Sequence, residues 1–148
     1  LYRVFCSEKV SAPTLMPQLK LLVADSSVSI DVRQLVAVFE SSQASAKVVG
    51  ECVRVLAAYA IARRDEHFTD GGWLTAGESY QRWLDLGGNP NSNIDRLGFE
   101  RGKLRNQLRK AGVLDVKALF DRQTSGYRTT LRLSLNPDQI FIEDDDLN

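Results

Sequence analysis

The chain is poor in the residues that build metal and redox sites. Its 148 residues include two cysteines and one histidine. Cys6 and Cys52 are too far apart for a metal-ligand or disulfide motif, and His67 has no His or Cys beside it in the sequence. We therefore expect no metal site. We interpret both cysteines as small buried residues in a reducing compartment, with a disulfide or a reactive thiol as the alternative.

Long apolar runs and catalytic motifs are also missing. No stretch approaches the roughly 18 to 20 apolar residues of a membrane span, whereas 43% hydrophobic and 26% charged residues are typical of a folded domain. The chain contains no nucleophile motif, phosphate-binding loop or dinucleotide-binding turn. We interpret His67, beside Asp65 and Glu66, as part of a polar loop rather than an acid–base site. These absences predict a protein that is not an enzyme, binds no cofactor and contacts no membrane.

The start of the chain carries no targeting signal. It begins with Leu1 rather than Met, and no basic stretch followed by a long apolar run opens it. We expect a cytoplasmic fragment of a longer protein.

The net charge is zero, but the charges are unevenly distributed. Nineteen Lys and Arg balance nineteen Asp and Glu. Residues 99–132 nevertheless contain nine basic and three acidic residues, a net charge of +6, and residues 143–146 are all acidic. This separation predicts a surface organised by sign, with a basic region suited to a polyanion. We interpret the acidic end as a solubilising tail; alternatives are a cover for the basic region and a contact with a basic partner.

Apolar spacing predicts helices in the first half of the chain. Residues 15–23 are apolar enough for a short helix, and residues 31–42 predict a second. One face of this second helix would carry four residues spaced i, i+3, i+4 and i+7: Val32, Leu35, Val36 and Phe39. Residues 44–64 predict a longer helix, apolar around much of its circumference and therefore packed on more than one side.

A capped helix follows a short extended piece at Trp73 and Leu74. Thr75 and Glu78 fit a capping box, in which each side chain satisfies a backbone N–H at the helix start. We expect this helix to end near Leu86, because residues 87–91 are all turn formers.

Residues 92–113 predict a helix with one apolar and one cationic face. Leu97, Leu104, Leu108 and Ala111 share the apolar face. The opposite face carries Gly102, Asn106, Arg109 and Lys110. Phe99 does not fit the apolar stripe, so we expect a break near Gly98, and Gly112 is expected to end the helix.

The apolar period then changes from 3.6 to 2, which predicts a β-hairpin. Its strands would cover residues 116–120 and 127–135, with a turn at residues 123–126, one apolar face and one cationic face. A short apolar segment, residues 140–142, precedes the acidic end.

The order of these elements resembles the winged helix-turn-helix family of DNA-binding domains. Residues 101–105, Arg-Gly-Lys-Leu-Arg, and residues 126–128, Gly-Tyr-Arg, are similar to the recognition helix and the last strand of response-regulator effector domains. The chain departs from that pattern because we expect helices, not a four-stranded sheet, before the first helix of the domain. The resemblance implies that the basic helix enters the major groove and the hairpin forms the wing.

We therefore expect a mainly α (α+β) fold, with N-terminal helices followed by a C-terminal winged helix with a β-hairpin wing. Residues 1–43 would form a helical region or arm that packs on the domain or forms a homodimer. Residues 44–136 would form the winged-helix domain, and residues 137–148 an acidic tail.

The expected function is double-stranded DNA binding in transcription regulation. Basic side chains would bind phosphates, and amide and Arg side chains would read bases. The candidate DNA-binding residues are Arg101, Lys103, Arg105, Asn106, Arg109, Lys110, Arg122, Gln123, Thr124, Ser125 and Arg128. One alternative is a winged-helix adaptor that docks a protein partner through the hairpin or residues 140–142. Another is a subunit that positions DNA in a larger DNA-processing or defence complex.

Overall fold

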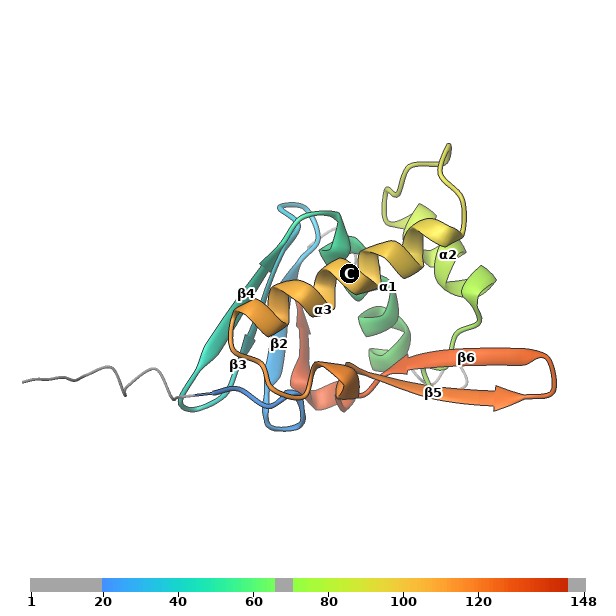
Figure 1. Cartoon of the computed structure of the whole chain (residues 1–148). Helices are drawn as coiled ribbons and strands as arrows, with labels where there is room; N and C mark the ends of the chain where they lie inside the picture. Colours follow the sequence, from blue (N-terminus) through green and yellow to red (C-terminus); the bar gives the residue numbers. More distant parts are fainter. Residues whose placement is uncertain (1–19, 66–70, 144–148) are drawn as a thin grey trace, which may run out of the picture.

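The computed structural model describes residues 20–65 and 71–143. These residues form three α-helices and six strands in two sheets, so the fold is α+β (Figure 1). One sheet has the strand order β4-β3-β2-β7, and β5 and β6 form a separate hairpin. The predicted mainly α fold with N-terminal helices is therefore wrong.

Strands replace the helices that we expected before residue 50. β2 (Ser27–Asp31), β3 (Val36–Glu40) and β4 (Ser45–Val49) pair antiparallel in sequence order. Alternate residues are buried in each strand, which is the period of a sheet with one face on the core. Leu35, which we placed on a helix face, lies in the turn between β2 and β3 with a φ of 55°.

The helix predicted over residues 15–23 lies only partly within the described residues. Of the helix predicted over residues 15–23, residues 15–19 lie outside the described part, and Val23–Asp25 form a short 3-10 helix. We also expected helices rather than a sheet before the first helix of the domain, and this is wrong because three paired strands precede it. Residues 27–49 contain strands, so they do not supply the N-terminal helices through which we expected a homodimer.

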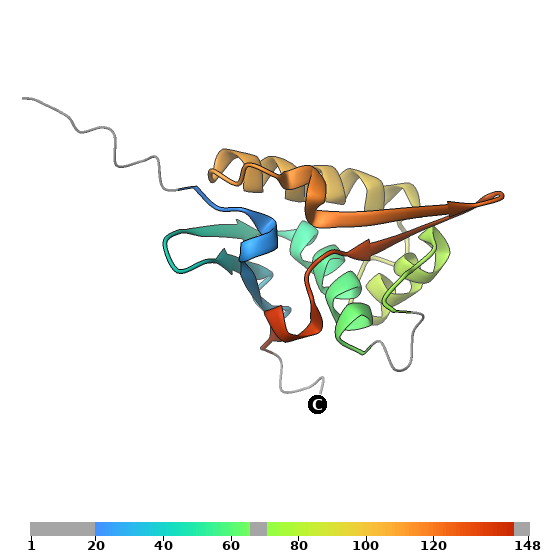
Figure 2. The ribbon, with the colours of Figure 1, turned by 90° about the horizontal axis from the view of Figure 1, so that it is seen from below.

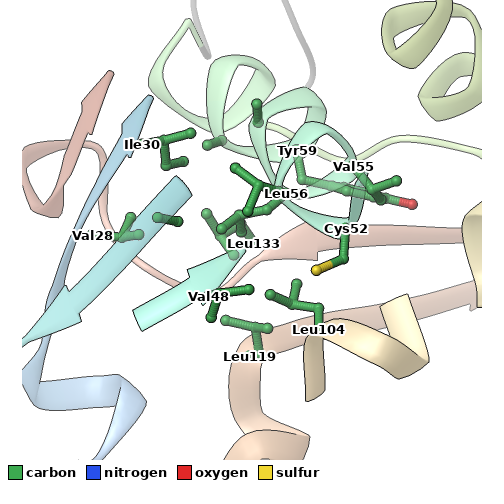
Figure 3. Packing of buried hydrophobic residues seen from close by; sticks show 14 of the residues in the cluster. Val28, Ile30, Val48, Cys52, Val55, Leu56, Tyr59, Leu104, Leu119 and Leu133 are labelled. Carbon is green, nitrogen blue, oxygen red and sulfur yellow. The ribbon is translucent and has the colours of Figure 1, made fainter. Parts of the chain in front are cut away.

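Helix α1 (Glu51–Arg64) begins directly after Gly50, whose φ of 100° is unfavourable for other residues. The first part of the helix predicted from residue 44 is therefore β4. The expectation that this helix packs on more than one side is confirmed, since it contacts β4, α2, α3 and β6. Figure 3 shows Leu56 and Tyr59 of α1 among residues from the sheet, α3 and the hairpin.

Helix α2 (Ala76–Asp85) has the predicted capping box. The Thr75 hydroxyl accepts a hydrogen bond from the Glu78 N–H at 3.2 Å, and the Glu78 carboxylate accepts one from the Thr75 N–H at 2.8 Å. This second bond lowers the pKa of Glu78. The extended piece before α2 is also present, because Leu74 pairs antiparallel with Leu131 of the hairpin.

Helix α3 (Asp95–Lys110) runs through Gly98 without the break that we expected, and Gly112 follows its end with a φ of 100°. A 3-10 helix, Val116–Leu119, replaces the first part of the predicted hairpin. The hairpin consists of β5 (Phe120–Ser125) and β6 (Arg128–Leu133), so residues 123–125 belong to a strand rather than to a turn. Its tip extends beyond α2 (Figure 2).

The C-terminal segment is part of the sheet. After a 3-10 helix, Pro137–Gln139, β7 (Ile140–Ile142) pairs parallel with β2. The buried cluster includes Val28, Leu56, Leu104 and Ile140, so one core spans all three regions into which we divided the sequence.

Gly88, in the turn after α2, lies directly against the ring of Trp83. A Cβ atom at Gly88 would overlap the ring of Trp83, which is 1% exposed. We expect Gly88→Ala to lower the free energy of unfolding by about 1–3 kcal/mol because the buried ring has to move. Gly77→Ala is the control: a Cβ atom there meets no atom within 4 Å, so urea denaturation should show no loss. Equal stability of the two variants would contradict this packing.

Candidate nucleic-acid interface

The inner face of α3 is anchored on the core. Leu97, Leu104 and Leu108 are almost fully buried, as the periodicity predicts, whereas Ala111 is exposed. Gln107 fastens the helix to the sheet, since its side-chain amide donates to the Val49 carbonyl at 2.8 Å and accepts from the Val49 N–H at 2.9 Å. Gln107 therefore positions the helix on the sheet.

The outer face of α3 carries the predicted cations. Lys103, Asn106, Arg109 and Lys110 are exposed, and Arg105 is partly exposed. Arg109 Nη1 donates to Asn106 Oδ1 at 2.9 Å, so these two side chains form a polar pair on the surface.

Three arginines form a row along one side of this face, at intervals of four residues. Partial burial lowers the pKa of Arg105, and the charges of Arg101 and Arg109 lower it further. Arg101 Nη1 also donates to the Tyr59 hydroxyl at 3.2 Å. Repulsion within the row means that an anion bound along it would relieve electrostatic stress.

Acidic side chains do not neutralise this face. Across residues 20–65 and 71–143, no ion pair involves any of the five cations of α3 from residue 101 onward. The one acidic residue in the middle of the helix, Glu100, is fully buried. Its Oε2 lies 2.6 Å from Arg96 Nε, and its Oε1 has no hydrogen-bond partner in the described residues.

The hairpin divides its five candidate residues between two faces. Arg122 and Thr124 share a face of β5 with Phe120, because side chains alternate along a strand. The Phe120 ring makes an edge contact with Tyr59 at 5.0 Å between centroids, and Tyr59 in turn contacts Arg101. Arg122 therefore lies on the hairpin face that carries the contact between Phe120 and Tyr59.

The other hairpin face turns toward α2. Gln123, Ser125 and Arg128 line an open hollow of about 710 Å³ between α2 and the hairpin. Arg128 Nη2 lies 3.9 Å from Glu78 Oε1, and both side chains are largely exposed. Arg122 and Thr124 thus lie on the opposite face of the hairpin from the other three candidates.

Sequence reasoning missed the position of Phe99. This side chain is 62% exposed on the outer face of α3, and Lys103 Nζ lies 5.4 Å from its ring centroid. Its mismatch with the apolar stripe was the available signal, but we interpreted the mismatch as a break in the helix.

In residues 20–65 and 71–143, no group of three or more His, Cys, Asp or Glu side chains could hold a metal ion. No helix in that part of the chain is long and apolar enough to cross a bilayer. Cys52 is buried, as expected, and burial raises its pKa to about 11. Cys6, His67 and the acidic residues 144–146 lie outside the described residues.

Comparison of the chain with models of known protein families, with curated proteins and with solved structures gives no match. The interface therefore has to be interpreted from its own geometry.

Proposed function

We propose that this chain is a non-catalytic cytoplasmic protein that binds double-stranded DNA through α3 and the β5–β6 hairpin, in transcription regulation. The observation that carries the proposal is the outer face of α3, where exposed cations stand on an anchored helix without acidic partners in the described residues. DNA carries about one negative charge per 1.7 Å of its axis, and each cation that neutralises a phosphate releases counterions.

The order of elements supports the same proposal. α1, the extended Leu74, α2, α3 and the hairpin follow one another, and Leu74 pairs with the second strand of the hairpin. This order resembles that of a winged helix, in which the third helix occupies the major groove and the hairpin lies beside it. Three strands before α1 also make the resemblance to response-regulator effector domains closer than the sequence suggested.

Some residues of the interface bind phosphates and others read bases, and side-chain chemistry decides which. Lys103, Arg105, Lys110 and Arg122 bind phosphates, which sets affinity and orientation without reading sequence. Asn106 and Arg109 reach base edges, since an amide pairs with adenine and a guanidinium with guanine in the major groove.

A salt titration tests the proposal. With a random-sequence duplex, these four phosphate contacts should give a slope of log K against log salt of about −3.6 in mobility-shift assays. A slope near zero, or no shift at low salt, would contradict DNA binding. Loss of DNA binding together with capture of a protein partner would favour the adaptor function instead.

A further inference from the structure

An exposed aromatic ring, Phe99, lies at the N-terminal end of the cationic face of α3. Phe99 lies four residues before Lys103 and seven before Asn106, so all three occupy neighbouring positions on the outer side of the helix. Single exposed apolar residues are common on protein surfaces. This one, however, lies beside Lys103, which the proposed function assigns to a phosphate.

The contact with Lys103 orients the ring. The ammonium lies 5.4 Å from the ring centroid, within the range of a cation–π interaction. A phosphate or base edge that binds Lys103 therefore meets the Phe99 ring at the same place.

Two glycines leave the helix backbone beside Phe99 without side chains that would cover it. Gly98 and Gly102 lie on the same side of α3, one residue before the ring and three after it. A Cβ atom at Gly102 would meet nothing within 4 Å, and one at Gly98 would be in ordinary contact with Arg101. Packing within the chain therefore requires neither glycine, although each weakens the helix relative to alanine. Their absence of side chains lets a partner approach the helix backbone beside the ring.

We propose that Phe99 determines sequence specificity by contacting the 5-methyl group of a thymine in the major groove. This inference rests on the proposed function. The thymine methyl is the apolar group that the four standard bases present in that groove, and apolar side chains recognise it by direct contact. The preferred DNA site therefore contains a thymine opposite the first half of α3, beside the bases that Asn106 and Arg109 contact.

The test uses the whole chain and a duplex enriched from a pool with a randomised centre. Each thymine of that duplex is replaced in turn by deoxyuridine, which lacks only the methyl group. At one position this replacement should weaken binding by the wild-type chain about fourfold, the value of one buried methyl group. Phe99→Ala should bind the thymine and deoxyuridine duplexes equally at that position, and Phe99→Leu should keep part of the preference.

Phe141 supplies a matched control. It is 54% exposed on β7, which lies away from α3 (Figure 2). Phe141→Ala should keep the wild-type preference for thymine. Thermal melts of both alanine variants should match the wild type, since both rings are exposed.

Three results would overturn the inference while leaving salt-dependent DNA binding intact. These are a chain that enriches no sequence, a wild-type chain indifferent to deoxyuridine at every position, and a Phe99→Ala variant that keeps the wild-type preference. Absence of salt-dependent binding in the first place would overturn the proposed function as well.

Discussion

Replacing Arg105, Arg109 and Lys110 together by alanine should remove most of the DNA affinity without unfolding the protein. Arg105 and Lys110 are phosphate contacts, and each lost phosphate contact lowers the slope of log K against log salt by about 0.9, so the slope should fall by about 1.8. Loss of Arg109 removes a base contact in addition. At about 50 mM salt this corresponds to a loss of affinity on the order of 10²- to 10³-fold. A mobility-shift series at several salt concentrations measures both quantities.

The fold should tolerate this triple substitution because none of the three side chains belongs to the core. Arg109 and Lys110 are exposed. Burial and the charges of its neighbours lower the pKa of Arg105, so the charged form of this side chain is disfavoured in the folded protein and its removal should cost little stability. The free energy of unfolding should therefore change by no more than about 0.5 kcal/mol.

A control with the same change in net charge separates a local contact from a general charge effect. Lys20, Arg33 and Lys47 are exposed and lie outside α3 and the hairpin. Their joint replacement by alanine should leave the salt slope within about one unit of the wild-type value. If both triple variants bound DNA equally well, the proposed interface would be wrong.

The capped helix α2 and the apolar face of α3 could be predicted because their signals are local. The capping box at Thr75 and Glu78 lies within four residues, and the stripe of Leu97, Leu104 and Leu108 lies within one helix. Phe99 was misplaced because we interpreted its departure from the stripe as a break. A glycine inside a helix costs only about 1 kcal/mol, which the anchored leucines on either side of Gly98 outweigh.

The N-terminal half could not be predicted because its apolar spacing fits two structures. Val32, Val36 and Phe39 match a helix face, whereas Ala37 and Phe39 match the alternation of a strand. Pairing decides between them, and pairing depends on the register of Val28 with Phe39 and of Ala37 with Val48. Such contacts between separate strands leave no periodic signal in a single segment.

The candidate site also combines features that a local pattern predicts with features that depend on contacts between distant segments. Periodicity alone placed Asn106, Arg109 and Lys110 outward, where the structure also has them. The role of Gln107 depends on Val49, 58 residues earlier in the chain, so no local pattern could reveal it. Glu100 is buried although it is charged, because its place in the helix period lies beside the leucines.

The largest expected effect on stability comes from Leu104, which joins α3 to the rest of the core. This side chain is 0% exposed and packs among residues that include Cys52 of α1 and Leu119 (Figure 3). Leu104→Ala leaves a cavity in the contact between α1 and α3, so the free energy of unfolding should fall by about 2–5 kcal/mol. Urea denaturation should show a lower midpoint with an unchanged slope.

Leu114 provides the control for this substitution, because it is a leucine just beyond the end of α3 that is 59% exposed. Leu114→Ala should change stability by no more than about 0.5 kcal/mol. Below its unfolding transition, Leu104→Ala should keep the wild-type salt slope in DNA binding, because every cation of the outer face remains in place. A normal midpoint for Leu104→Ala would show that the inner face of α3 is not anchored. The interface proposed on its outer face would then lose its support.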